Sequence, residues 1–470
     1  MTSGSRPLTT RPRSKMARPA PKANRWLSQP IDEERPLLDG ANVEATSLAA
    51  KLPARHVISA KTHRESFSVD HGWIPWLQVI AGWVLFANSW GLPTAYGTFQ
   101  TYYTQNLLSE YRSATIAWIG SLQLFFCTIG CLPAGIMLDQ GYLQGLIALG
   151  SALEVTGLVA VSFSTQYWQI LLAQGALVGM GCGLLGLLPV AVISMYFEKK
   201  RMLAVGLAAT GASFAGIAQP IILKYLFEHI GFSWAVRMFA LSIQLSSTLP
   251  FFIMRLQSEG VEGRSRFGFH HFKDLTYTTF VCTFTLIQAG AMVPVFFIQE
   301  YALNLGIDET MAFHLLAILN MAGLFGRFVP NFIADHYGGI NTLLPLTFTC
   351  IILLVTLPWF NTFPSLVVFC VLYGFASAGT LILPSPIITK LLPCAADLGV
   401  RMGLAYLFAA FGGLVGNPLS SSAKKENDPD AAREFRGIWW IAAGVLTMAF
   451  CALLCTRRLK VGTVFGRCQI

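Results

Sequence analysis

The chain has 470 residues, of which 54% are hydrophobic and only 12% are charged, and its formal net charge is +9. A soluble globular domain carries about 25% charged residues, so the composition argues against a soluble protein and indicates one that lies in lipid. Twelve of the 33 Lys and Arg residues fall within residues 1–72, which indicates a basic tail beside anionic lipid and gives no reason to expect nucleic-acid binding.

Residues 1–72 are predicted to form a disordered cytoplasmic tail. Their beginning lacks the apolar core of a secretory signal peptide. It is Arg-rich and acid-poor like a transit peptide, but Pro7, Pro12 and Pro19 would break the amphipathic helix that such a peptide needs.

Twelve apolar segments follow, each close to or above the roughly 20 residues that a helix needs to cross a bilayer. Pro and Gly inside several of them are tolerable in a membrane bundle, where neighbouring helices satisfy the freed backbone groups. The predicted fold class is therefore an all-α membrane protein with twelve transmembrane helices. The segments are 73–97, 114–138, 143–163, 168–194, 203–226, 233–255, 275–301, 310–334, 341–361, 364–389, 399–422 and 437–457.

A polar stretch at 256–274 divides the segments into two sets of six. We therefore expect an N-terminal bundle over 73–255, a cytoplasmic linker, a C-terminal bundle over 275–457 and a short cytoplasmic tail over 458–470. Most Lys and Arg residues outside the segments fall on the side of the N-terminal tail, so the positive-inside rule places both termini in the cytoplasm.

The two sets share a junction motif at the same position. Gly135 is followed by three apolar residues, Asp139 and then a glycine within three residues. Asn331 is likewise followed by three apolar residues, Asp335 and a nearby glycine. A repeat at matching positions is typical of transporters built from two related halves.

Glycines recur at four-residue spacing within 168–194, at Gly175, Gly179 and Gly183. Small residues at this spacing let membrane helices approach closely. The run around Gly181 also resembles a dinucleotide-binding loop, but no strand precedes it, so we interpret it as a packing face.

Several stretches together resemble the monocarboxylate-porter family of the major facilitator superfamily, in its fungal branch. The resemblance covers about 73–457. It is carried by Asp70-His71-Gly72-Trp73, by Tyr196 to Arg201 with Leu203 to Ala208, by Gly326-Arg327 through Asp335, and by Arg401-Met402-Gly403 with Gly412 to Pro418.

The resemblance implies a major-facilitator fold, in which two six-helix bundles rock around one central site by alternating access. It assigns a gating role to Asp139 and Asp335, which would hold the cytoplasmic side closed by binding helix N-termini. It also implies that Arg327 meets a substrate carboxylate, which suits its forked donors. The alternative for Arg327 is a salt bridge that only locks the halves together.

This chain departs from the family pattern at three positions. Thr94 stands where proton-linked members have Lys, Gly323 where they have Asp, and Gln140 where a basic residue is usual. Proton-linked transport of a small monocarboxylate is therefore not implied. Glu154, deep in the third segment, is the candidate to carry a coupled proton; the alternative is a glutamate bonded to Ser, Thr or Gln of a neighbouring helix.

Polar residues in the middle of the segments are candidates to line the cavity, although each could instead bridge two helices. We expect no cofactor and no metal site, because the Cys and His residues show no ligand spacing. The predicted substrate-binding set is Arg327, Asn88, Thr94, Gln123, Gln288 and Asn320.

The sequence thus predicts a secondary active transporter of a small organic anion or metabolite, not an enzyme. The fungal branch includes exporters of secondary metabolites, which favours efflux across the plasma membrane over a vacuolar role, with a co-transported proton left open. The alternatives are an uptake carrier for a monocarboxylate or a riboflavin-like nutrient, and a membrane sensor that does not transport.

Overall fold

The computed structural model describes residues 72–257, 268–391, 397–424 and 431–461. Within these ranges the regular structure is entirely helical. The predicted N-terminal tail lies outside the described residues apart from Gly72, as do much of the linker and the end of the C-terminal tail.

The N-terminal half contains several spans that are divided into consecutive helices. The interruptions fall within two residues of a glycine or proline, or at short π-helical stretches. The helices are α2 (Trp73–Ser89), α3 (Gly91–Thr94), α4 (Tyr96–Tyr102), η1 (Tyr103–Leu107), α5 (Ser113–Ile129), α6 (Cys131–Asp139), α7 (Leu143–Phe163), α8 (Tyr167–Ile170), η2 (Leu171–Val178), α9 (Gly179–Gly186), α10 (Leu188–Tyr196), α11 (Arg201–Ile230) and α12 (Phe232–Ile253).

The C-terminal half begins after a short 3-10 turn. Asp274 caps its first long helix by accepting from the backbone N–H groups of Thr276 at 3.0 Å and Tyr277 at 3.4 Å. The helices are η3 (Phe269–Lys273), α13 (Leu275–Ala291), α14 (Val293–Asn304), α15 (Glu309–Tyr337), α16 (Gly339–Thr356), η4 (Leu357–Trp359), α17 (Phe363–Ile382), α18 (Pro384–Leu391), α19 (Leu398–Ser421) and α20 (Ala431–Val461).

Eleven helical stretches in the described ranges are long and apolar enough to cross a membrane. The remaining predicted segment, 73–97, is also helical but is divided into α2, α3 and α4. Its breaks fall at Trp90 and Ala95, on either side of a short helix that contains Pro93; proline has no backbone N–H to continue the helical hydrogen bonds. The prediction of an all-α membrane protein is confirmed, with the first segment more broken than the sequence indicated.

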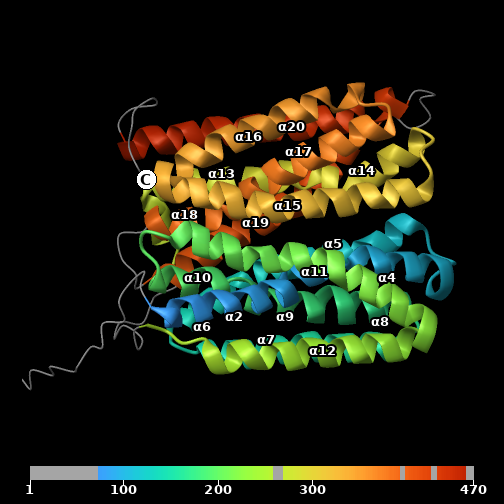
Figure 1. Cartoon of the computed structure of the whole chain (residues 1–470), viewed down its shortest axis with the longest axis horizontal. Coiled ribbons are helices and arrows are strands. Elements are labelled where there is room, and N and C mark those ends of the chain that lie inside the picture. Colours follow the sequence, from blue (N-terminus) through green and yellow to red (C-terminus); the bar gives the residue numbers. More distant parts are fainter. Residues whose placement is uncertain (1–71, 258–267, 392–396, 425–430, 462–470) are drawn as a thin grey trace, which may run out of the picture. The chain divides into compact units, whose positions relative to one another are not determined.

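The helices of each half lie together, α2–α12 on one side and α13–α20 on the other (Figure 1). Two long helices connect the sides. α11 packs along α2 in its own half and along α15 in the other, while α19 packs along α13 and also along α6. These two helix pairs, α11 with α15 and α19 with α6, form the seam between the halves.

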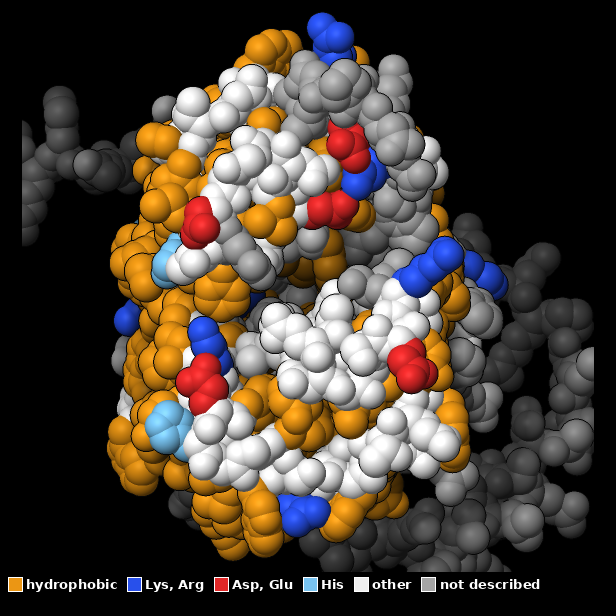
Figure 2. Space-filling view, turned by 90° about the vertical axis from the view of Figure 1, so that its right-hand side faces the viewer, with side chains coloured by type: hydrophobic (Ala, Val, Ile, Leu, Met, Phe, Trp, Pro, Cys, Tyr) orange, Lys and Arg blue, Asp and Glu red, His pale blue; other side chains and the backbone are white. Residues whose placement is uncertain are grey.

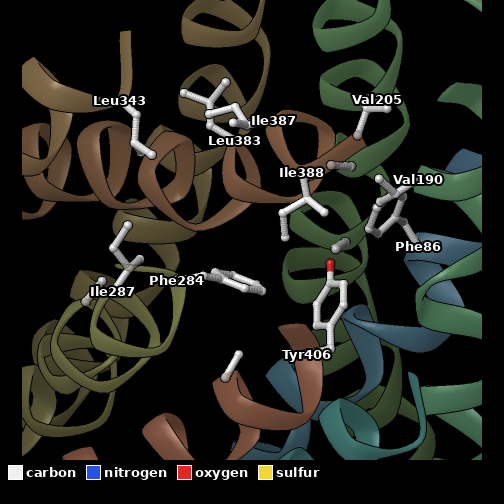
Figure 3. Packing of buried hydrophobic residues seen from close by; sticks show 14 of the residues in the cluster. Phe86, Val190, Val205, Phe284, Ile287, Leu343, Leu383, Ile387, Ile388 and Tyr406 are labelled. Carbon is white, nitrogen blue, oxygen red and sulfur yellow. The ribbon is translucent and has the colours of Figure 1, made fainter. Parts of the chain in front are cut away.

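Apolar side chains fill part of this seam. Figure 3 shows Phe86 and Val190 of the N-terminal half close to Ile388 and Tyr406 of the C-terminal half, with Phe284 beside them. All five are at most 4% exposed. A continuous apolar core across the seam means that the two halves are packed together in this conformation.

Candidate functional site

Asp139 joins the two halves at the end of the bundle that carries α6, α10 and α18. Its carboxylate accepts hydrogen bonds from the backbone N–H groups of Gly399 at 2.7 Å and Val400 at 2.8 Å. Both groups belong to the first turn of α19, where helix N–H groups lack partners within the helix and the dipole favours an anion. We call this end, on the left of Figure 1, the aspartate end, and the opposite end the far end.

Asp335 forms the matching junction from the C-terminal half. It accepts from the backbone N–H groups of Met202 at 2.9 Å and Leu203 at 2.8 Å, in the first turn of α11. Lys390 lies 3.9 Å from the same carboxylate. The expected binding of helix N-termini by both aspartates is therefore present in the structure, and each bond set crosses between the halves.

Glycines bring the two halves into backbone contact at the aspartate end. A Cβ added at Gly206 would lie 2.5 Å from the carbonyl oxygen of Arg327 and 2.6 Å from Cβ of Asn331. A Cβ at Gly403 would lie 2.8 Å from Cα of Leu132. The far end differs, because Figure 2 shows a hollow between the two groups of helices there. The structure is closed at the aspartate end.

Arg327 of α15 points at α11 of the other half. Its Nη1 donates to Ser213 Oγ at 2.6 Å and to the carbonyl oxygen of Ala209 at 3.3 Å. Among the described residues, no Asp or Glu forms an ion pair with Arg327, and its Nε and Nη2 groups make no hydrogen bond. The salt-bridge alternative therefore has no partner in the described chain, and the cation keeps free donors at membrane depth.

Thr94 and Asn320 lie near the same stretch of α11. A Cβ added at Gly216 would lie 2.8 Å from Thr94 Oγ1 and 3.8 Å from Asn320 Oδ1. Gly216 follows Ser213 by about one turn, so both polar side chains lie about one turn beyond the guanidinium of Arg327. Thr94 is exposed even though its helix is within the bundle, which indicates that it faces the hollow.

Gln288 lies on α13, about one turn from Phe284 and on the same helix face. It is 8% exposed and makes no side-chain hydrogen bond with another described residue. Its free amide near the seam is consistent with the predicted cavity position.

Asn88 and Gln123 are not brought to this region. Asn88 donates to Ser246 Oγ at 2.9 Å and Ser247 Oγ at 3.0 Å, so its amide joins α2 to α12 within one half. Gln123 is fully buried in the N-terminal half, with its backbone against Gly179 of α9. Both therefore lie apart from Arg327, and Asn88 has the bridging position that was the alternative for these residues.

An aromatic group crosses the seam, and the sequence did not predict that its members meet. The ring of Tyr406 lies 6.1 Å from Trp90 of the N-terminal half and 5.3 Å from Phe284 of α13. Its hydroxyl is 2.6 Å from Ser385 Oγ. A buried tyrosine hydroxyl usually has a hydrogen-bond partner. The presence of Tyr406 inside an apolar segment could therefore have predicted a polar contact at this position. Ser213 was missed because it lies among the small residues Gly211, Ala212 and Ala215, and nothing in this run predicts a partner for an arginine.

Glu154 lies in the interior of the N-terminal half and not at the seam. It is 0% exposed, and neither carboxyl oxygen has a hydrogen-bond partner in the described chain. The alternative of a bond to Ser, Thr or Gln is therefore not found there. No group of three or more His, Cys, Asp and Glu residues that could hold a metal occurs in the described ranges either.

Comparison with known proteins places the chain in a family. The model of the Major Facilitator Superfamily matches residues 78–416. The MFS-type transporter dbaD of Emericella nidulans is 32% identical over 82% of this chain and 86% of its own length. The agnestins efflux protein of Paecilomyces divaricatus is 32% identical over 73% of this chain and 79% of its own length.

Solved structures share the fold at low sequence identity. The fucose transporter FucP in its outward conformation covers 81% of this chain and 98% of its own, with a TM-score of 0.59 and 15% identity. A bacterial homologue of ferroportin covers 82% and 99%, with a TM-score of 0.63 and 12% identity. The monocarboxylate-porter branch is not distinguished by these matches and stays a prediction. The chain belongs to the Major Facilitator Superfamily and is a multi-pass membrane transporter, not an enzyme.

Proposed function

We propose that this transporter exports a ring-bearing organic anion, such as a secondary metabolite, by alternating access. The observation that carries the proposal is Arg327, a cation within a membrane span that has no acidic partner in the described chain. Placing an unpaired Arg at that depth costs at least about 2.5 kcal/mol. An anionic substrate that binds there would offset this cost.

The site has the chemistry of an amphipathic ligand. Ser213 orients the guanidinium through Nη1 and leaves Nε and Nη2 to bind a carboxylate or a phenolate in the forked geometry that Arg favours. Trp90, Tyr406 and Phe284 contact one another across the seam and make this part of it aromatic; the rings become available to a ligand as the halves move apart. Such a pair of features suits a substrate larger than lactate or pyruvate.

The two aspartate junctions form the contacts that must break when the aspartate end opens. We place the aspartate end in the cytoplasm, from the Lys and Arg distribution, so the described conformation is closed toward the cytoplasm. Opening that end breaks the hydrogen bonds of Asp139 and Asp335 to four backbone N–H groups. Each net hydrogen bond is worth about 1 kcal/mol, so the total is a few kcal/mol, within the range that ligand binding can shift.

The direction of transport rests on the relatives. One is named as an efflux protein for agnestins and another, from Emericella nidulans, for aspyridones. We therefore propose export at the plasma membrane, with both termini cytoplasmic and an inward proton as the driving ion. Uptake of a monocarboxylate or a riboflavin-like nutrient is the competing function, and a non-transporting sensor is the competing class.

A deletion strain of the source organism tests the proposal. We expect one aromatic or ring-bearing acid to accumulate in the cells and to disappear from the medium. Reintroducing the wild-type gene should restore its release, and Arg327→Lys should not, with equal amounts of protein at the cell surface. Loss of uptake in place of release would support the competing carrier, and an unchanged metabolite profile would contradict export.

A further inference from the structure

The last turn of the linker between the halves docks on α19 at the aspartate end. His271 of η3 is 3% exposed, and its Nδ1 accepts a hydrogen bond from Nε of Arg401 at 3.1 Å. The next residue, Phe272, lies against Phe408, which is two turns further along α19, with the ring centroids 5.2 Å apart. Two neighbouring side chains of the linker therefore contact one face of a helix that forms part of the seam.

The docked turn of α19 is the turn that Asp139 binds. The two N–H groups that donate to Asp139 belong to Gly399 and Val400, directly before Arg401. The carbonyl oxygen of Arg401 accepts from the hydroxyl of Tyr277 on α13 at 2.6 Å. The first turn of α19 is thus held by Asp139 of the opposite half on one side and by the linker and α13 on the other. The contact with the linker therefore positions the turn that closes the aspartate end.

The hydrogen bond between Arg401 and His271 requires a neutral imidazole. The Nε–H group of an arginine can only donate, so Nδ1 of His271 must offer its lone pair and the ring proton must be on Nε2. An imidazolium would turn one N–H group toward another and would place two cations side by side in a buried site, which is unfavourable. The docked position of the linker is therefore compatible only with unprotonated His271.

Arg401 is the charge that meets the imidazole. The carboxylates of Asp139 and Asp274 accept from N–H groups at the starts of α19 and α13, and Asp397 forms no ion pair within the described residues. The other titratable and charged groups near this contact are Asp397 of α19, Lys273 and Asp274 of the linker, Tyr277 of α13, Arg457 of α20 and, across the seam, Asp139 of α6.

We propose that the contact between His271 and Arg401 is a pH-sensitive switch, which keeps the aspartate end closed while His271 is neutral and lets it open when His271 is protonated. The inference rests on the proposed alternating access, in which the bonds of Asp139 break as this end opens, and it concerns the regulation of that step. The proton is bound and released on one side of the membrane and is not transported. With the aspartate end in the cytoplasm, acidification by an accumulating organic acid opens the side from which the acid is loaded.

Thiol labelling of Thr389→Cys at two pH values tests the switch in the full-length protein in lipid, without any substrate. Thr389 lies in the closed seam and is 7% exposed, so a cysteine there is labelled when the aspartate end opens. Mass spectrometry of the peptide that contains residue 389 gives the rate, which is divided by the rate for the unfolded protein at the same pH. We expect this ratio to rise about tenfold from pH 7.5 to pH 5.5, because a free imidazole titrates near pH 6.5 and the proton binds only in the open conformation.

Two substitutions of His271 separate its charge from its packing. His271→Gln keeps an acceptor for Nε of Arg401 and does not titrate, so labelling of Thr389→Cys should be slow at both pH values. His271→Lys carries a charge at both pH values and should give fast labelling at both. His229→Gln changes an exposed histidine at the far end of α11 and is the matched control, which should retain the pH dependence of the wild-type background.

Three outcomes would overturn the switch. They are a pH dependence that persists in His271→Gln, slow labelling of a folded His271→Lys variant at pH 7.5, and a pH dependence that is lost in His336→Gln, beside Asp335 in the chain, and kept in His271→Gln. Labelling requires neither substrate nor export. A failure of the switch therefore leaves the proposed export untouched, and a failure of export in cells leaves the labelling result standing.

Discussion

The two aspartate junctions have the same backbone contacts and different surroundings. Asp139 and Asp335 each accept from two N–H groups at the start of a helix in the opposite half, at 2.7–2.8 Å and 2.8–2.9 Å respectively. Two turns before each aspartate, however, the N-terminal half has Cys131 and the C-terminal half has Arg327. One turn before it, the pair is Gly135 and Asn331.

The difference indicates a division of roles between the halves. A junction made of a carboxylate and backbone N–H groups does not depend on the neighbouring side chains. Both halves can therefore have this junction although the side chains before each aspartate differ. The C-terminal copy carries the charge that we assign to the substrate, held by Ser213 of the N-terminal half. The two aspartate junctions are therefore equivalent in the two halves, whereas the proposed binding site is not.

Of the variants that test this difference between the halves, Arg327→Gln should have the largest effect on transport. Charged hydrogen bonds contribute up to about 3 kcal/mol each, so transport of the exported acid should fall about 100-fold or more. Cys131→Ser, the equivalent position in the other half, should leave transport within about twofold. Release of the acid from cells with matched surface expression measures both, and equal losses would contradict an asymmetric site.

The helices and the paired position of the two aspartates could be predicted from local and repeated patterns, whereas the contacts of the aspartates with helix N-termini were implied by the family resemblance. Apolar length predicted the spans, and the repeated Asp with its glycine predicted the paired junctions. Tyr406 and Ser213 could not be predicted, since their roles depend on which helices cross the seam. The position of Asn88 also depends on tertiary packing, because Ser246 and Ser247 reach it from a helix far along the chain.

Removing either aspartate should have the next largest effect, which is on the equilibrium between the closed and open states of the aspartate end. Asp139→Ala and Asp335→Ala each leave two backbone N–H groups without their acceptor, at a cost of about 2–3 kcal/mol, which raises the population open at the aspartate end tenfold or more. Asp335→Ala also removes the contact of this carboxylate with Lys390.

A cysteine at Thr389 can report this opening. Thr389 is 7% exposed and accepts a hydrogen bond from Arg201 of the other half at 3.3 Å, so Thr389→Cys should be labelled by a thiol reagent only when the seam opens. We expect faster labelling in both aspartate variants than in Thr389→Cys alone. Unchanged labelling would refute the gating role of both aspartates.

Adding a methyl group at the seam glycines should have a smaller effect that differs between the halves. Gly206→Ala would collide with the backbone of Arg327, and Gly403→Ala with that of Leu132. Overpacking of this kind costs about 1–3 kcal/mol, so both should lower the melting temperature. Only Gly206→Ala should also weaken transport strongly, because it displaces the guanidinium. Gly413→Ala, which meets nothing within 4 Å, is the control and should leave both properties unchanged.

Lys424 should have the smallest effect, because its ion pairs lie within one half. It contacts Glu300 at 2.6 Å and Glu434 at 3.1 Å. Burial alone would lower the pKa of Lys424, but the hydrogen bonds and charges of Glu300 and Glu434 outweigh burial and raise the pKa above the usual value for Lys. Partly exposed pairs of this kind contribute less than about 1 kcal/mol.

A raised pKa fixes the pH dependence of this contribution. The pairs should stabilise the protein fully below the usual Lys pKa of about 10.4 and lose their effect as the pH rises through the higher folded-state value. Melting temperatures of wild type and Lys424→Gln should therefore differ by a small constant amount near neutral pH and converge as the pH rises above the raised folded-state pKa of Lys424. The described contacts of Lys424 all lie within the C-terminal half, so labelling of Thr389→Cys should be unchanged in this variant. Faster labelling would show that the far end also holds the halves together.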